Sequence, residues 1–300
     1  MLVNPSFRIE LERIKTGVTE CAMPSHDFGF LSEYTDLTLT NPLLAKKLAE
    51  SDLKKTKEYI FAKKLDLELV VAPTLSGRVV PLHLSPDIIV YVCRSDRKKV
   101  VEKKAEKMFR LELRALRKES LKDWLKIFEI EGRMLGYPEC CIEKFVKLKE
   151  KSFYGESVPP ETAVIIQCLE QDFFEVLRFF RNPSEIPEQY FAFFTSNFYP
   201  CDVNCRRAIS IGITVKEHLD ERLGRIYERK LVLNVLNLLV SAYNAYLLVK
   251  ERGARTEFGK MVSGYFESLP SEDLKMISYL ARRLSSDGIK FENEYLLRFD

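Results

Sequence analysis

Residues 95–119 read SDRKKVVEKKAEKMFRLELRALRKE. Strong helix formers dominate this segment, and apolar residues recur every three to four positions, in contrast to the valine- and isoleucine-rich runs that precede it. The same helical period, or residues that start and stop helices, continues to about Arg283. The pattern predicts a long helix here and a mainly helical chain beyond it.

Three short segments before residue 95 are typical of β-strands. Residues 67–73, 78–84 and 87–93 are rich in valine, isoleucine and leucine, and they are separated by Ser76-Gly77 and Ser85-Pro86. Because serine, glycine and proline favour turns, these segments predict a small antiparallel sheet with a hairpin turn at Ser76-Gly77.

The beginning of the chain has a weaker pattern. Residues 1–39 show no sustained period, and one strand is predicted near residues 7–14. Asn41 can cap a helix that has Pro42 at its first position, and apolar residues among lysines continue this pattern to about Lys64. We therefore expect one or two amphipathic helices there.

Residues that start and stop helices divide the chain after the first quoted segment. Ser120 followed by Asp123 is a capping signature that starts a helix ending near Gly136, and Pro159-Pro160 marks a later break. Residues 289–299 predict a terminal strand.

The predicted fold class is α+β and predominantly α-helical. A small mixed part with the antiparallel sheet is expected over residues 1–95. A larger helical domain, which carries the cysteine site described below, is expected over residues 96–300; one continuous globular unit fits the same pattern.

The composition excludes several classes of protein. With 300 residues, 46% of them hydrophobic and 30% charged, the chain can bury a core and is not disordered. A formal net charge of +3 does not by itself indicate nucleic-acid binding. Seven cysteines are too few for a disulfide scaffold, and no apolar signal segment follows Met1, so a reducing, cytoplasmic setting is expected. Glutamine occurs only at Gln167, Gln171 and Gln189, a bias typical of thermophiles.

Four of the seven cysteines lie in two motifs that open with Tyr-Pro. The first motif is GYPECC at residues 136–141, and the second contains YPCDVNC at residues 199–205. Because proline favours the first helical position, the first pair of cysteines is predicted in the first turn of a helix. The second pair, four residues apart, is predicted on one face at the start of another helix, and a helix N-terminus stabilises thiolates. We call these residues the four-cysteine group: Cys140, Cys141, Cys201 and Cys205.

The spacing of the four-cysteine group leaves several kinds of chemistry open. Four thiolates from two helix starts could hold an iron–sulfur cluster or a tetrahedral zinc ion. The adjacent pair favours a multi-metal cluster, or a site in which only one of the two is a ligand, because neighbouring side chains on a helix diverge by about 100°. The cysteines could instead act as redox or nucleophilic thiols, form one or two disulfides, or be buried as small apolar residues.

The other three cysteines are expected to differ from this group. Cys93 lies in an apolar strand segment and Cys168 in an apolar helical stretch, so both are predicted in the core. Cys21 stands five residues before His26, and these two residues are possible additional metal ligands. His218 would lie about 20 Å along a helix from the second motif, too far to share its site.

The two cysteine motifs together resemble a known family. Gly-Tyr-Pro-x-Cys-Cys followed some sixty residues later by Tyr-Pro-Cys-x-x-x-Cys, in a mainly helical chain, is similar to the largely archaeal family catalogued as domain of unknown function 483. The resemblance implies a recurring four-cysteine site within about residues 124–217, and it implies no activity. It also implies a histidine before the second Pro-Cys segment, where this chain has Asn197-Phe198-Tyr199.

The segment quoted first also carries a basic row. From residue 94 to residue 119, eleven lysines and arginines stand against five acidic residues. On a helix the row would extend about 27 Å, enough to follow several phosphates of RNA or DNA. The alternative is a solvent-exposed face on which Glu102 and Glu106 pair with neighbouring lysines. The row, at steps of three to four residues, consists of Lys99, Lys103, Lys107, Arg110, Arg114 and Arg117.

Residues 231–249 contain no formally charged side chain, which meets the length test for a membrane span. A row of polar side chains on this otherwise apolar helix argues against a span. We therefore expect a helix inside a soluble domain, whose polar row faces water or lines the cysteine site. The row consists of Asn234, Asn237, Ser241 and Asn244.

These observations predict a protein that binds an iron–sulfur cluster or zinc through the four-cysteine group. It would serve an electron-transfer, modification or cofactor-assembly system, with a redox protein as one possible partner and no membrane. Whether the chain is an enzyme does not follow from its sequence. The alternatives are an accessory protein that binds RNA or other nucleic acid and has structural cysteines or disulfides, and a thiol redox enzyme. No phosphate-binding glycine loop and no Ser-His-Asp pattern occurs.

Overall fold

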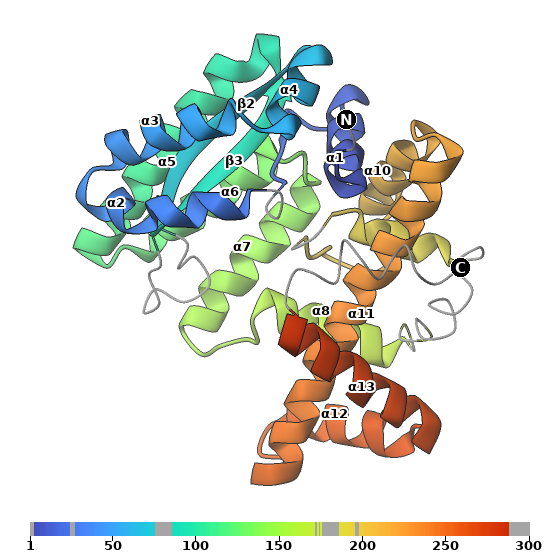
Figure 1. Ribbon diagram of the computed structural model, residues 1–300. Coiled ribbons are helices and arrows are strands. Elements are labelled where there is room, and N and C mark those ends of the chain that lie inside the picture. The colour runs from blue at the N-terminus through green and yellow to red at the C-terminus, as the bar shows by residue number, and fades with distance from the viewer. Residues whose placement is uncertain are drawn as a thin grey trace. The chain divides into compact units, whose positions relative to one another are not determined.

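The computed structural model describes residues 3–24, 28–75, 86–171, 173, 175, 186–195 and 198–287. Its contacts divide the chain into two compact units, Met1–Phe153 and Tyr154–Asp300, which we call the first and the second unit. Figure 1 shows that the strands lie in the early part of the chain and that the later part is helical. The predicted fold class, α+β with a predominance of helix and a small antiparallel sheet in the N-terminal part, is confirmed.

The first unit contains a three-stranded antiparallel sheet. The strands β1 (Cys21–Ala22), β2 (Leu67–Leu75) and β3 (Pro86–Arg94) follow the order β1-β3-β2. The two longer strands confirm the predictions for residues 67–73 and 87–93. The predicted strand over residues 78–84 and the turn at Ser76-Gly77 lie outside the described residues.

Helices surround this sheet, and most of them begin at a residue that the sequence marks. Asn41 caps α3 by accepting a hydrogen bond from the Leu44 N–H at 3.1 Å, and Ser120 caps α6 through the Asp123 N–H. Both starts confirm the sequence prediction. The helical elements of the first unit are α1 (Pro5–Lys15), η1 (Gly29–Tyr34), α2 (Thr35–Thr40), α3 (Pro42–Leu53), α4 (Lys57–Lys64), η2 (Ser95–Arg97), α5 (Lys98–Lys118), α6 (Leu121–Met134) and α7 (Glu139–Phe153).

The helix α1 stands where the sequence was predicted to be irregular with one strand, so this prediction is wrong. Asn4 caps α1 by accepting a hydrogen bond from the Ser6 N–H at 2.9 Å. Phe7, Leu11 and Ile14 then recur at helical spacing, and all three are fully buried. The cap and this spacing outweigh the strand-like alternation of apolar and charged residues at Phe7, Ile9 and Leu11.

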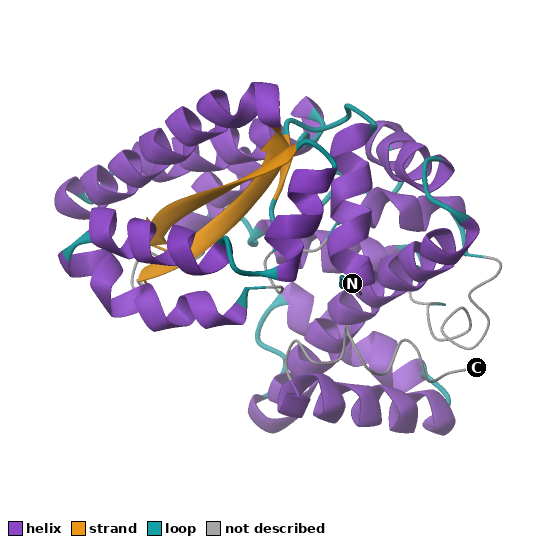
Figure 2. Cartoon of the chain, turned by 45° about the horizontal axis from the view of Figure 1, so that its top comes forward, coloured by secondary structure: helices purple, strands orange, loops and turns teal. Residues whose placement is uncertain are grey.

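Both faces of the sheet are buried, as Figure 2 shows for the orange strands between purple helices. On one face Val71 and Val90 belong to a core with residues of α1, α3 and α4. On the other face Val70 and Tyr91 belong to a core with residues of α5 and α6. Burial on both faces explains why the strands have continuous apolar runs instead of alternating patterns. The predicted domain boundary after residue 95 stays a prediction.

The second unit has helices and no strand among its described residues. The long helix α11 contacts each of the other described helices of the unit. Aromatic rings fill the space beside it; the rings of Tyr246 and Phe266 stack with centroids 5.3 Å apart. The predicted terminal strand over residues 289–299 lies outside the described residues. The elements are α8 (Pro160–Glu170), η4 (Glu188–Phe193), α10 (Arg206–Glu217), α11 (Glu221–Arg252), α12 (Glu257–Ser268) and α13 (Ser271–Asp287).

By length and composition alone, α11 could cross a membrane, but 56% of its most apolar 18-residue stretch is buried inside the structure. Three members of its predicted polar row, Asn237, Ser241 and Asn244, are exposed. The fourth, Asn234, donates a hydrogen bond to the Phe193 carbonyl at 2.8 Å. The polar row therefore faces water and a neighbouring backbone, which is consistent with a core helix of a soluble protein.

Candidate metal centre

The first cysteine motif begins with a tight turn between α6 and α7. Gly136 has φ +73°, and a Cβ at this position would lie 2.4 Å from the Val18 carbonyl oxygen. Only glycine fits both the left-handed backbone and this close approach. The turn thereby delivers the chain to Pro138, whose carbonyl accepts the first helical hydrogen bond, from the Ile142 N–H at 3.0 Å.

Cys140 and Cys141 therefore lie in the first turn of α7, as the sequence predicts. Cys140 is half-buried, and Cys141 is only 2% exposed. At this end of a helix the backbone N–H groups and the helix dipole favour nearby negative charge. The helix start also has an ion pair, in which Arg133 lowers the pKa of the exposed Glu139 carboxyl by hydrogen bonding.

The second motif differs from its prediction. Cys201 and Cys205 do not share a helix face, because α10 begins only at Arg206 and Cys205 is the residue that precedes its first turn. The side chain of Asp202 accepts a hydrogen bond from the Asn204 N–H at 2.8 Å, and the Asp202 carbonyl accepts one from the Cys205 N–H at 2.9 Å. Such local bonds compete with the helix and form a turn instead.

The tyrosines that open both motifs have hydroxyls in a desolvated environment. Burial raises the pKa of the Tyr199 hydroxyl to about 12, and it also raises the pKa of the Tyr137 hydroxyl. Both hydroxyls stay protonated at neutral pH, so neither tyrosine adds negative charge beside the cysteines.

Two glutamines, Gln167 on α8 and Gln171 directly after it, hold the second motif, although the sequence marks them only by the scarcity of glutamine. The Gln167 side chain accepts a hydrogen bond from the Val203 N–H at 3.2 Å and donates one to the Cys201 carbonyl at 3.5 Å. Gln171 accepts a hydrogen bond from the Asn204 side chain at 2.7 Å. The scarcity of glutamine in the chain is the only sequence signal that could have drawn attention to these residues.

A close helix contact fixes the start of α10. A Cβ at Gly212 would lie 2.2 Å from the Phe191 carbonyl oxygen, so α10 lies against the backbone of η4 at this point. Cys205, at the N-terminal end of α10, is 9% exposed. The second motif is thus anchored from two sides, by the α8 glutamines and by the α10–η4 contact.

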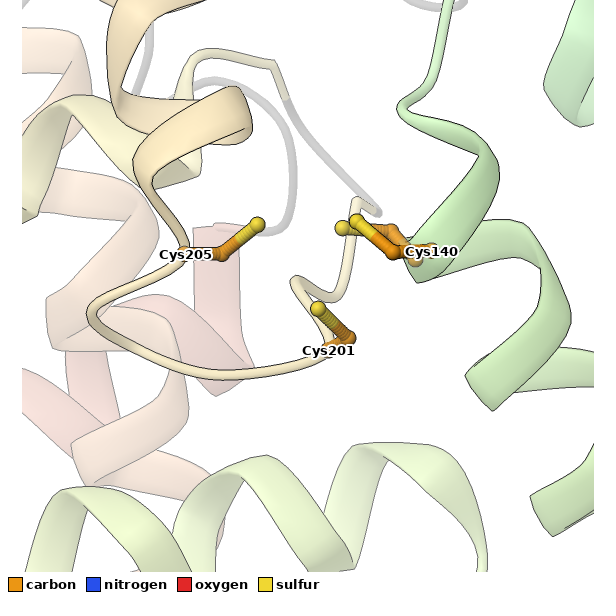
Figure 3. Close-up of side chains that lie close together, drawn as sticks. Cys140, Cys201 and Cys205 are labelled. Atoms are coloured by element: carbon orange, nitrogen blue, oxygen red, sulfur yellow. The ribbon is translucent and has the colours of Figure 1, made fainter.

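The sulfur atoms of Cys140, Cys141, Cys201 and Cys205 all lie within 4.8 Å of one another. Figure 3 shows the side chains of Cys140, Cys201 and Cys205 directed toward a common space. Four sulfur donors at this spacing are compatible with holding a metal ion. The structure therefore brings together the four residues that the two motifs single out.

The remaining sequence candidates lie elsewhere or are not described. Cys21 is on β1, directly across the strand pair from Cys93, and it does not belong to the group of four sulfurs. His26 lies outside the described residues. His218 follows α10 and contacts the Thr214 carbonyl through its Nδ1 at 2.8 Å.

Burial suppresses the acidity of the three cysteines outside the group. It raises the pKa of Cys93 to about 12, and it raises the pKa values of Cys21 and Cys168 well above the usual range. All three side chains are fully buried. Cys93 and Cys168 are therefore core residues, as predicted, and Cys21 joins them.

The six residues of the basic row all lie on α5 and are all exposed. The opposite face of α5, with Val101, Ala105 and Met108, is buried against the sheet.

Comparison with curated proteins and with solved structures gives no match. The matching family model spans both cysteine motifs and α5, and it confirms the family resemblance drawn from the motifs. Residues 95–233 of the chain match the family described as protein of unknown function, DUF483.

Proposed function

We propose that the four-cysteine group holds one tetrahedral metal ion, with zinc as its first candidate. The observation that carries this proposal is the separation of the four sulfur atoms, none more than 4.8 Å from another. A zinc ion with four thiolate ligands at about 2.3 Å has sulfur–sulfur separations of about 3.8 Å. The present spacing needs only a small contraction to reach that geometry.

The same spacing argues against a multi-iron cluster. In a [4Fe–4S] cluster each cysteine binds a different iron, and in a [2Fe–2S] cluster each iron takes two cysteines, so in both clusters thiolates on different irons lie farther apart than around a single ion. Adjacent cysteines on a helix were expected to diverge. The sulfurs of Cys140 and Cys141 nevertheless both belong to the group, so both can bind the same ion.

The chemistry of a closed four-thiolate site is structural. Such a site leaves no open coordination position for water or substrate, which a catalytic zinc site requires. The four thiols would lose their protons when the metal binds, and the bound ion would then link the two motifs. Cys140 and Cys141 lie in the first turn of α7, and Cys205 directly precedes α10, so three of the four sulfurs belong to helix starts, where backbone N–H groups favour nearby negative charge.

A single iron ion is the second candidate for the same four sulfurs. Tetrahedral sulfur sites select zinc or iron, and iron would convert the role from a structural one to electron transfer. The predicted redox partner belongs to this candidate. The disulfide and thiol redox enzyme alternatives, the cytoplasmic location and the archaeal, thermophilic source stay predictions.

Anaerobic purification followed by measurement of zinc, iron and acid-labile sulfide per chain tests the proposal. We expect one metal ion per chain, no sulfide, and loss of the metal when Cys141 or Cys205 is replaced by serine. A brown protein with several irons and sulfide would establish a cluster instead. A colourless protein without metal that loses thiols in air would favour disulfides.

A further inference from the structure

Most side chains of the basic row on α5 form no salt bridge with a described residue. Among its six exposed residues, Arg114 alone takes part in an ion pair with a described residue; its Nε donates to the Asp123 carboxylate at 2.6 Å. Within the described part of the chain, no carboxylate forms a salt bridge with the other five, which are Lys99, Lys103, Lys107, Arg110 and Arg117.

The alternative interpretation of the row is a solvent-exposed face, and it requires acidic residues on the same helix that pair with the lysines. Glu102 and Glu106 stand at helical spacing from several of the lysines, yet neither forms a salt bridge with any described residue. On α5, the mutual pairing that usually neutralises a charged helix face is therefore absent among the described residues. Five adjacent cations remain available to an external anion.

The spacing of the row suits a regular polyanion. Successive members are three or four residues apart, which corresponds to about 4.5–6 Å of helix rise, and the whole row extends about 27 Å. A nucleic-acid duplex carries a negative charge about every 1.7 Å of its axis, so a helix lying along it can meet several phosphates.

The neighbouring side chains distinguish a duplex from other anionic partners. Val100 is the only large hydrophobic residue of α5 that is exposed, at 37%, so the helix has no apolar face to enter a membrane. Phe109 is half-buried, and no aromatic side chain on α5 is exposed for stacking with unpaired bases.

We propose that the exposed face of α5 binds the phosphate backbone of double-stranded nucleic acid without reading its sequence. The five unpaired cations would each displace counterions from the duplex, which makes the affinity strongly dependent on salt. This proposal is independent of the metal centre, because the basic row lies on α5 and none of its residues belongs to the four-cysteine group.

The test measures the anisotropy of fluorescently labelled RNA and DNA duplexes of about 20 base pairs, two helical turns, with the full chain at several salt concentrations. If all five cations contact phosphates, the logarithm of the affinity should fall with the logarithm of salt concentration with a slope of about −4.5. The triple variant K103Q/K107Q/R110Q should bind more weakly, and its slope should be shallower by about 2.7.

A matched triple variant controls for net charge. Lys47, Lys54 and Lys64 are exposed, and none forms a salt bridge with a described residue. They lie in or next to α3 and α4, which cover the other face of the sheet. The variant K47Q/K54Q/K64Q removes the same charge and should leave the slope within one contact of the wild-type value. Circular dichroism verifies that both variants keep the fold.

Three results would overturn the proposal. The first is that the wild-type chain binds neither duplex at low salt. The second is that both triple variants lower the slope equally, because binding would then follow net charge. The third is tighter binding to anionic vesicles or to polyglutamate than to either duplex.

Discussion

The chain contains two groups of cysteines in opposite environments. Cys21 and Cys93 face each other across two strands, are fully buried, and have raised pKa values, so they remain thiols. The four-cysteine group lies at a helix start, in a turn and directly before a helix, and two of its residues, Cys140 and Cys201, are only half-buried. The same side chain is thus a core residue in one place and a candidate ligand in the other.

The largest expected effect separates these two groups directly. Cys205→Ser should reduce the bound metal from one ion per chain to nearly none, because a closed four-thiolate site loses a ligand that a serine hydroxyl does not replace. Cys93→Ala should keep the full metal content. Elemental analysis of the two variants, purified side by side, measures the difference. Equal metal contents would remove the distinction between the groups.

A glycine substitution should disturb both groups. In Gly136→Ala the new Cβ meets the Val18 carbonyl and Thr19, and Thr19 itself donates a hydrogen bond to the Cys21 carbonyl. We expect a loss of roughly 2–4 kcal/mol in the free energy of unfolding, from left-handed strain and steric overlap together. Denaturant titration measures this loss.

Gly155→Ala is the matched control for this substitution. Gly155 has the same φ of +73°, but nothing lies within 4 Å of its added Cβ. Only the strain remains, so the expected loss is about 1–2 kcal/mol. Equal losses in the two variants would show that the close contact with Val18 is not important.

A substitution on α8 tests whether this helix positions the second motif. Gln167→Ala removes both hydrogen bonds to the turn that carries Cys201, and partners that orient ligands in this way typically change metal affinity by about 10–100-fold. Competition with a zinc chelator measures this affinity. Gln189→Ala is the control, because Gln189 is exposed on η4. If the two variants bind zinc equally, α8 does not position the motif.

The smallest effect concerns pH and the strand pair. Burial raises the pKa of Cys93 to about 12, whereas an unfolded cysteine titrates near 8.5. Between these values the native thiol keeps its proton and the unfolded one has lost it, so stability falls as pH rises. The contribution is roughly 1.4 kcal/mol per pH unit above about pH 8.5. The stability of Cys93→Ala should therefore decline less steeply; parallel pH profiles would contradict this cause.

Much of the fold could be predicted because local signals agree with tertiary packing. The caps at Asn41 and Ser120 and the apolar runs of β2 and β3 each indicate the element that forms. The prediction for α1 is wrong because the alternation of apolar and charged residues over residues 7–11 resembles a strand, whereas Asn4-Pro5 is a helix start. The cap is the stronger physical signal there, since it satisfies backbone N–H groups that a helix start leaves open.

The four cysteines of the candidate site could be predicted from the sequence, but the residues that hold the second motif in place could not. Two Tyr-Pro motifs identify the four cysteines, while the turn before α10 depends on a local bond of Asp202 that competes with the helix. The bonds from Gln167 span more than thirty residues of chain, and no sequence period records such a contact.

X-ray absorption spectroscopy of the anaerobically purified protein measures the ligand shell of the bound metal. One ion held by the four-cysteine group predicts a single shell of four sulfur atoms at about 2.3 Å and no metal–metal scattering. A metal neighbour at short distance, or a shell in which nitrogen or oxygen replaces two or more sulfurs, would contradict it.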